Sequence, residues 1–170
     1  NSVLKKMYRE YSVEHYLDLV KKLKEAKPGI VLSTDIIVGF PNETEIEFQE
    51  TLDLLTAAQF DSIFSYVYSP RANTPAEKLV DDVTKEEKKS RLHRVHEHQL
   101  KIQADLRAKM VGNTYKVLVE GKSSQGGVEK WKGRTSCNRI VHFSSPREGL
   151  KWKWVDLEIL SATYLSCQGK

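Results

Sequence analysis

The stretch Ser33-Thr34-Asp35-Ile36-Ile37-Val38-Gly39-Phe40-Pro41-Asn42-Glu43-Thr44 decides the fold class of this chain. Residues 30–38 are largely apolar and β-branched, which is typical of a parallel strand covered on both faces. The strand leads into a tight Gly-Phe-Pro turn, and Thr44 with Glu47 forms a capping box that begins a helix. The pattern therefore predicts a strand–turn–helix unit of an α/β fold.

The segments around this unit predict the order α-β-α-β-α over residues 1–110. Ser12 is an expected N-cap for a helix that ends at Lys27-Pro28-Gly29, and a second strand covers residues 63–68. Thr84 begins a long helix that runs to about Met110. Parallel strands joined by crossover helices follow from this order. The expected inward side chains of the last two helices are Phe48, Leu52, Leu55, Leu92, Val95, Ile102 and Leu106.

Beyond Met110 the apolar residues no longer recur at helical spacing. They alternate with polar residues in short segments. Five strands are expected at residues 114–120, 128–134, 139–143, 151–160 and 162–166, separated by turns rich in Ser, Gly, Asn and Pro. Five short strands in about 60 residues predict a small antiparallel β-barrel. We therefore divide the chain into domains at residues 1–110 and 111–170.

The loops after the two parallel strands form the expected binding edge, because ligands bind where such strands end. Amides of the Gly39–Glu43 turn and the following helix N-terminus would face a polar or anionic group. The alternative is a purely structural turn. Asp35 is a charge within an apolar strand, so it is either paired, with Arg71 as candidate, or lines a cavity. Alternatively both side chains point into solvent.

Positive charge is concentrated in the second domain. Residues 1–110 hold 17 Lys and Arg against 18 Asp and Glu, whereas residues 111–170 hold 10 against 5. All three tryptophans also lie there, in Lys130-Trp131-Lys132-Gly133-Arg134 and Lys151-Trp152-Lys153-Trp154. Cations beside aromatic rings suit RNA. Trp152 and Trp154 should lie opposite a core face formed by residues 155, 157 and 159. The alternative is that the rings cap one end of the barrel.

Several other classes of function find no support in the residues. Cys137 and Cys167 are isolated, which favours a reducing, cytosolic setting over a disulfide framework. No apolar run approaches the ~18 residues of a membrane span. His93, His96 and His98 indicate a solvated helical face more than a metal site. No nucleophile–base arrangement, phosphate loop or dinucleotide fingerprint is present, so the residues alone do not define a reaction.

At these motifs the chain resembles the methylthiotransferases of the radical S-adenosylmethionine superfamily, in particular the branch acting on N6-isopentenyladenosine in tRNA. The matching residues, in chain order, are Val3-Leu4-Lys5, Met7, Arg9, Tyr11, Ser33–Pro41, Glu43, Tyr68–Arg71 and Thr74–Ala76. Val119-Glu120-Gly121, Gly133-Arg134-Thr135, Asn138-Arg139 and Phe143 resemble the family's TRAM domain, a small OB-like, RNA-binding β-barrel.

The resemblance implies that this chain is the C-terminal part of a partial parallel (β/α) barrel followed by a TRAM domain. It implies S-adenosylmethionine and two [4Fe–4S] clusters in the intact parent, whose cluster cysteines lie in an N-terminal portion that this chain lacks. The implied cosubstrate contacts are Asp35, Gly39, Phe40, Pro41, Tyr68 and Arg71. The implied RNA contacts are Lys130, Trp131, Lys132, Arg134, Arg139, Lys151 and Lys153.

The resemblance also fixes the expected function. The parent would add a methylthio group at C2 of N6-isopentenyladenosine beside the anticodon, as a cytoplasmic monomer that binds the tRNA anticodon arm. The present chain, which begins at Asn1, would be inactive alone. Asn42 and Asn73 stand where the family usually has glycine, and we expect these turns to persist because Asn tolerates a left-handed backbone. Gly149 should form the turn before Trp152.

Three alternatives remain open from the sequence. A sister methylthiotransferase would act on threonylcarbamoyl-adenosine in tRNA or on a ribosomal protein, although the basic barrel argues against the protein substrate. A free-standing RNA-binding protein is an alternative of another class, and cysteine motifs upstream of Asn1 would decide against it. The α/β part could also be only a scaffold.

Overall fold

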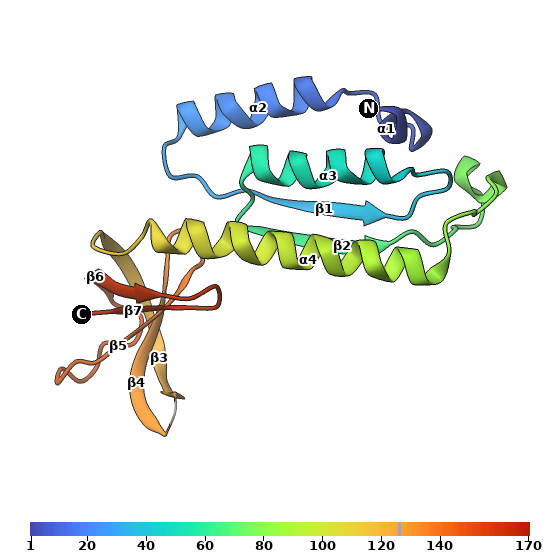
Figure 1. Ribbon diagram of the computed structural model, residues 1–170. Coiled ribbons are helices and arrows are strands. Elements are labelled where there is room, and N and C mark those ends of the chain that lie inside the picture. The colour runs from blue at the N-terminus through green and yellow to red at the C-terminus, as the bar shows by residue number, and fades with distance from the viewer. Residues whose placement is uncertain (126) are drawn as a thin grey trace. The chain divides into compact units, whose positions relative to one another are not determined.

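A computed structural model describes residues 1–125 and 127–170 (Figure 1). The chain divides into two compact units, Asn1–Ile102 and Gln103–Lys170. The division falls within a long helix, some residues before our expected boundary near residue 111. Within the described residues, no helix has both the length and the apolar character needed to cross a membrane.

The first unit has the order of elements that the sequence predicts. Its elements are α1 (Ser2–Lys6), α2 (Val13–Ala26), β1 (Ser33–Val38), α3 (Glu45–Ala58), β2 (Ser62–Val67), the 3₁₀ helix η1 (Pro75–Lys78) and α4 (Lys85–Ala108). β1 and β2 pair in parallel, which confirms the prediction. The short α1 was not predicted, and β1 begins at Ser33 rather than at residue 30.

Local capping explains where the helices begin. The Ser12 hydroxyl accepts a hydrogen bond from the His15 amide, and Thr44 and Glu47 form both halves of a capping box. The Thr84 hydroxyl accepts from the Glu87 amide at 3.1 Å. Each contact satisfies a backbone donor that the helix itself leaves unpaired. The three predicted helix starts are therefore confirmed.

The core of the first unit lies between one face of the sheet and its helices. Ile36 and Val38 of β1 are buried, as are Phe48, Leu52 and Leu55 of α3. Val95 and Ile102 contribute from α4, whereas the other two predicted inward residues of that helix, at positions 92 and 106, are only partly buried. Periodicity thus predicted the buried helix faces correctly.

The second face of the sheet is open, which corrects our expectation of a strand covered on both sides. Exposed side chains alternate with buried ones along β1. In the parallel register Asp35 lies opposite Phe64 and Ile37 opposite Tyr66, and all four are exposed. A β-branched run predicts a buried strand only when both faces have a covering layer, and within the described residues this face has none.

The second unit is a closed five-stranded barrel. Its strands are β3 (Thr114–Gln125), β4 (Val128–Thr135), β5 (Ile140–Phe143), β6 (Trp154–Ala162) and β7 (Cys167–Gly169), in the order β3-β4-β5-β7-β6. Among the described residues of this unit, β5 and β7 are the one parallel pair, and the other neighbours are antiparallel. The predicted barrel is confirmed. The predicted fifth strand at 162–166 is wrong, because the Thr163 amide donates to the Ser166 carbonyl in a turn and the strand follows it.

The barrel core confirms the predicted inward face of β6. Leu157 and Ile159 are buried and Val155 packs against the same cluster. Trp131 of β4 also belongs to this core and is only 6% exposed. Asn42 and Asn73 have φ values of 60° and 64°, so both turns take the left-handed conformation that we expected Asn to tolerate.

Candidate functional site

The first unit has a cavity at the ends of β1 and β2 where the sequence predicts a binding edge. Its volume is about 730 Å³. Met7, Ile37, Phe40, Tyr66 and Pro75 supply apolar surface, and α1 and the loop after β2 form its sides. This arrangement is possible because both parallel strands end at the same edge of the sheet.

Two aromatic rings line one side of this cavity, and a lysine of α4 contacts one of them. The Phe40 and Tyr68 rings meet edge to face with centroids 5.0 Å apart. Lys88 of α4 places its Nζ atom 5.3 Å from the Tyr68 centroid and donates to Asp81 at 2.6 Å. The Tyr68 hydroxyl donates to the Ala76 carbonyl at 3.0 Å, and burial, with nearby Asp81, raises the pKa of this phenol. Tyr68 therefore stays a protonated donor that anchors the loop.

The polar lining of the cavity is positive. Lys6, Arg9 and Arg71 contribute to it, and no Asp or Glu belongs to its described lining. Three of the predicted cosubstrate contacts line this cavity: Phe40, Tyr68 and Arg71. A concave, partly aromatic site with several cations and no carboxylate suits a ligand that combines a flat ring with an anionic group.

The turn between β1 and α3 uses its amides internally. The Gly39 amide donates to the Glu43 carboxylate at 2.7 Å, and the Asn42 amide donates to Asp82 at 2.6 Å. The Thr44 amide is taken by the capping box. Our functional interpretation, in which these amides face a ligand, is therefore wrong, and the structural alternative describes the turn. Gly39 and Pro41 are buried behind the cavity wall and do not line it.

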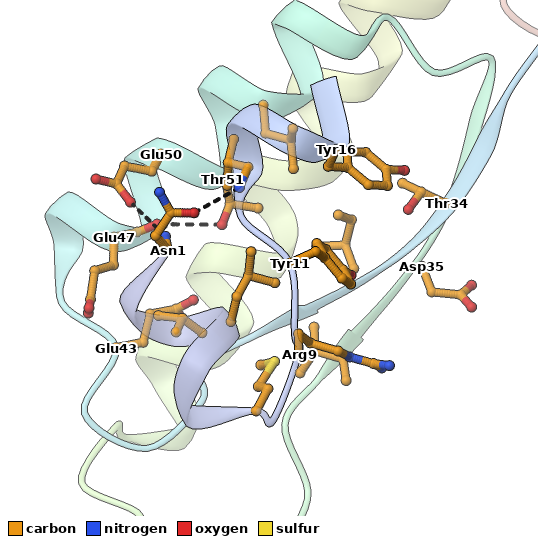
Figure 2. A pocket seen from close by; sticks show the side chains of 17 residues that line it. Asn1, Arg9, Tyr11, Tyr16, Thr34, Asp35, Glu43, Glu47, Glu50 and Thr51 are labelled. Atoms are coloured by element: carbon orange, nitrogen blue, oxygen red, sulfur yellow. Dashed lines mark hydrogen bonds and ion pairs between the residues drawn. The ribbon is translucent and has the colours of Figure 1, made fainter. Parts of the chain in front are cut away.

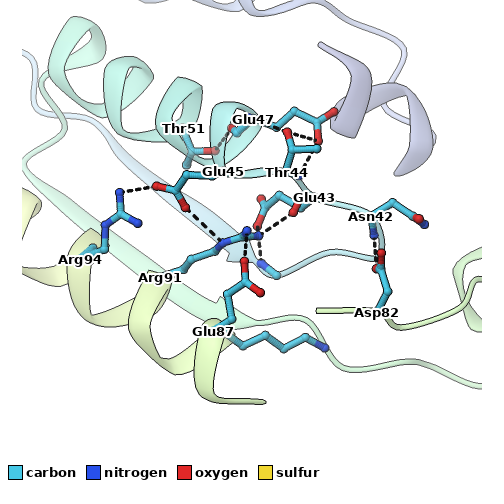
Figure 3. A network of polar contacts seen from close by, with 12 residues as sticks. Asn42, Glu43, Thr44, Glu45, Glu47, Thr51, Asp82, Glu87, Arg91 and Arg94 are labelled. Carbon is cyan, nitrogen blue, oxygen red and sulfur yellow. Dashed lines mark hydrogen bonds and ion pairs between the residues drawn. The ribbon is translucent and has the colours of Figure 1, made fainter. Parts of the chain in front are cut away.

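A buried ion pair holds this turn against α4 (Figure 3). An Arg91 Nη atom lies 2.7 Å from the Glu43 carboxylate and 2.9 Å from the Glu43 carbonyl oxygen. Arg91 also pairs with Glu87, one turn earlier on its own helix. Burial raises the pKa of Glu43, while the Gly39 amide and Arg91 oppose that effect by stabilising the carboxylate. Sequence reasoning missed this pair, because its members are far apart in the chain.

Asp35 lies at a second, smaller cavity and not in the first one. This cavity of about 200 Å³ is enclosed by α1, α2, β1 and α3 (Figure 2). Figure 2 shows Asp35 at the right of the view, with Tyr11 and Arg9 to its left. Asp35 and Arg71 are both exposed, and no ion pair joins them among the described residues. The prediction that the two are partners is therefore wrong.

The predicted RNA contacts lie on β4 and in the segments just before β5 and β6. Lys130, Lys132 and Arg134 lie along β4, Arg139 precedes β5, and Lys151 and Lys153 precede β6. Arg134 is partly committed within the barrel, because its Nε donates to Glu120 at 2.9 Å and an Nη atom donates to the Asn138 carbonyl at 3.2 Å. The prediction that Trp131 contacts RNA is wrong, because its side chain lies in the barrel core.

Comparison with known proteins identifies the class. A model of the Radical SAM superfamily matches residues 1–55, which include β1 and the turn that follows it. The chain is 47% identical over 150 residues to the tRNA-2-methylthio-N(6)-dimethylallyladenosine synthase of Anoxybacillus flavithermus, an alignment that covers 88% of this chain and 28% of that protein. The synthases of that name from Bacillus anthracis and Desulfosudis oleivorans are 43% and 44% identical over 99% and 87% of this chain.

The chain therefore belongs to the radical SAM superfamily, a class that implies S-adenosylmethionine and an iron–sulfur cluster. Within that superfamily it belongs to the methylthiotransferase family, as a segment related to the tRNA-2-methylthio-N(6)-dimethylallyladenosine synthases. The chain spans only about a third of the length of these relatives, between 28% and 33% in these three proteins.

Proposed function

We propose that this chain forms part of an enzyme that adds a methylthio group at C2 of N6-isopentenyladenosine beside the tRNA anticodon. The observation that carries the proposal is the 43% identity to the Bacillus anthracis synthase over 99% of the chain, across both units. An arrangement of cavity and basic barrel on one chain is what such an enzyme needs, because it binds a small cosubstrate and a large nucleic acid.

We propose that the cavity at the ends of β1 and β2 forms part of the S-adenosylmethionine site. The Phe40 and Tyr68 rings would contact the adenine, and Arg71 with Lys6 and Arg9 would hold an anionic group. The cavity's apolar wall supports this fit, as do Arg9 and Arg71, whereas Lys6 also pairs with Glu47 at 3.8 Å. When bound, S-adenosylmethionine would supply the methyl group and the oxidising radical, whereas these side chains would bind and orient it.

The residues of this chain do not fit an iron–sulfur cluster. The sequence has two cysteines, and no group of three or more His, Cys, Asp or Glu side chains gathers at metal-site distances within the described residues. We propose that the intact enzyme holds two [4Fe–4S] clusters on ligands outside this chain, and that the chain alone is inactive. The role of this chain's side chains is therefore to bind and orient the cosubstrate, and none of them takes part in a step through a cluster.

We propose that residues 111–170 form a TRAM domain that binds the anticodon arm of tRNA, while residues 1–110 belong to the radical SAM barrel. The expected phosphate contacts are Lys130, Lys132, Arg134, Arg139, Lys151 and Lys153. Their positions on β4 and just before β5 and β6 of a small barrel, with the local charge excess, support the assignment. We further propose that the intact enzyme is a cytoplasmic monomer.

Titration of this chain with an anticodon stem-loop RNA at several salt concentrations tests the RNA-binding half of the proposal. We expect affinity to fall as salt rises, with a log–log slope of about 0.7 per phosphate contact on single-stranded RNA. An Arg134→Ala/Arg139→Ala variant should bind less tightly, and a Lys85→Ala/Lys89→Ala variant on α4 serves as a charge-matched control. Salt-independent binding, or none by a folded sample, would contradict the assignment.

The sister reaction on threonylcarbamoyl-adenosine stays the second candidate because of one feature of the cavity. Three cations line it without a carboxylate, and a threonylcarbamoyl group carries a carboxylate that such a lining would also accept. Stem-loops carrying each modified adenosine, compared in the same titration, separate the two candidates. The proposal expects the N6-isopentenyladenosine form to bind at least as tightly.

A further inference from the structure

Two tryptophans, two positions apart in the sequence, are exposed where β6 begins. The side chains of Trp152 and Trp154 are 66% and 58% exposed, although tryptophan carries the largest apolar surface of any residue. Folded chains rarely leave two such rings in water without a use for them. The barrel's third tryptophan, Trp131, is buried, so this chain is able to bury such a ring.

The backbone holds these rings in place. The Trp152 amide donates to the Val119 carbonyl at 2.7 Å, and the Val119 amide donates to the Lys153 carbonyl at 2.9 Å. Leu150, just before them, is buried in the core. Trp152 itself has a φ of 64°, a left-handed conformation that is uncommon for a bulky side chain. The segment therefore displays the rings from a fixed position, and a rigid aromatic side chain loses little entropy on binding.

The charged residues near the two tryptophan rings indicate what kind of ligand the rings bind. Lys151 places its Nζ atom 5.3 Å from the centroid of the Trp152 ring, and Lys153 lies between the two tryptophans in sequence. Both lysines are exposed, and in the part of the chain that the structure describes no carboxylate pairs with either of them. By contrast, Lys122 and Lys132 already have carboxylate partners. Unpaired cations beside exposed rings match phosphates beside unstacked bases.

We propose that Trp152 and Trp154 form a platform on which an unpaired base of the RNA stacks, with Lys151 and Lys153 contacting the adjoining phosphates. This inference rests on the proposed RNA-binding function and adds to it the kind of nucleotide that the barrel reads. The ligand is a single-stranded loop or end, because bases within a duplex have no free ring face. RNA binding through charge alone would not require exposed aromatic rings.

The test compares stem-loop binding by the unaltered chain and by Trp152→Ala/Trp154→Ala. The probe is an anticodon stem-loop with 2-aminopurine at an unpaired loop position, whose fluorescence falls when it stacks. We expect the double variant to bind about tenfold less tightly, to lose the quenching, and to keep the salt slope. Lys151→Gln/Lys153→Gln should instead lower the slope by about 0.7 for each phosphate that the protein no longer holds.

Two controls separate the platform from other causes. Tyr164→Ala removes an exposed ring from the turn before β7 and should leave both affinity and quenching unchanged. In Trp152→Ala/Trp154→Ala the buried Trp131 is the one remaining tryptophan of the sequence, so its fluorescence reports whether that barrel is folded, and circular dichroism reports folding of the other variants. A fully paired duplex should bind more weakly than the stem-loop.

The possible failures are distinguishable. Salt-dependent stem-loop binding that the tryptophan substitutions leave unchanged would overturn the platform but keep the RNA-binding proposal. Equal affinity for duplex and stem-loop would also overturn the platform. Failure of the unaltered, folded chain to bind any RNA would overturn both proposals.

Discussion

Glu43 and Arg91 form a buried ion pair, 2.7 Å apart, with 1% and 2% of their side chains exposed. The pair joins the turn after β1 to α4, and the same carboxylate accepts the Gly39 amide. Because the cavity wall residues Phe40 and Tyr68 flank this turn, the pair fixes the geometry of the proposed cosubstrate site. Its removal should therefore affect both stability and ligand binding.

We expect Arg91→Ala to destabilise the first unit by about 3–5 kcal/mol, because it leaves the Glu43 carboxylate buried without its cation. Urea unfolding followed by circular dichroism measures this. Arg94→Ala is the matched control: Arg94 lies one turn along α4 and pairs with the exposed Glu45 at 2.7 Å. A partly exposed pair of this kind contributes about 1 kcal/mol or less. An equal decrease in the free energy of unfolding of the two variants would contradict the stabilising role given to the Glu43–Arg91 pair.

Gly39→Ala should perturb the cavity wall more than its backbone strain alone explains. Gly39 has a φ of 70°, and an added Cβ would lie 2.4 Å from Lys88 Cγ. Gly29→Ala is the control, because Gly29 has a φ of 80° with nothing within 4 Å. Left-handed strain costs both variants about 1–2 kcal/mol. We expect Gly39→Ala to unfold at clearly lower urea concentration; indistinguishable midpoints would show that Lys88 moves aside freely.

Gly133→Ala should disrupt the barrel. An added Cβ would lie 2.5 Å from the Leu118 carbonyl oxygen and 2.6 Å from a Val117 methyl, and a backbone atom cannot move aside as a flexible side chain can. In a Trp152→Ala/Trp154→Ala background, where Trp131 is the one remaining tryptophan, its fluorescence should report partial or complete unfolding of the second unit. Gly127 has open space around it, so Gly127→Ala should destabilise the barrel only through backbone strain. A native Trp131 spectrum in Gly133→Ala would contradict this prediction.

His142 should make the barrel less stable in acid. Burial lowers the pKa of His142 below 6.5, and Lys132 and Lys130 lower it further. As pH falls, the unfolded state therefore binds the proton first. The stabilising contribution is complete above pH 6.5 and is lost as pH falls through the folded pKa. His142→Gln should weaken this dependence.

NMR titration of the His142 ring measures its pKa directly. Lys132→Gln should move that pKa upward, because it removes a neighbouring positive charge, whereas Lys101→Gln on α4 should leave it unchanged. A lower pKa in Lys132→Gln would contradict the assigned cause.

Local sequence signals predicted most of the fold, and contacts between distant residues account for what they missed. Capping residues such as Thr44, and the alternation along β6, act within a few residues and are visible in the sequence. The Glu43–Arg91 pair joins positions 48 residues apart and has no local signature. The burial of Trp131, by contrast, follows the alternation along β4, where Trp131, Gly133 and Thr135 are buried and the residues between them are only partly buried. The short β7 has no β-branched residue and was therefore placed too early.

The candidate site was predicted less completely for a related reason. The sequence correctly placed Phe40, Tyr68 and Arg71 at one strand edge, because parallel strands end together. It did not show that Asp35 belongs to a different cavity, which depends on the packing of α1 and α2. Nor did it show that the turn amides are already satisfied.

Transplanting this chain into a relative tests the central claim most directly. This chain would replace the matching segment of the Bacillus anthracis synthase in a strain that lacks its own synthase. Mass spectrometry of digested tRNA would then quantify the methylthiolated nucleosides. We expect 2-methylthio-N6-isopentenyladenosine to be restored, and Phe40→Ala or Arg71→Ala in the same protein to reduce it at equal protein level. A stable chimeric protein that yields no methylthiolated adenosine, or only the threonylcarbamoyl form, would contradict the account.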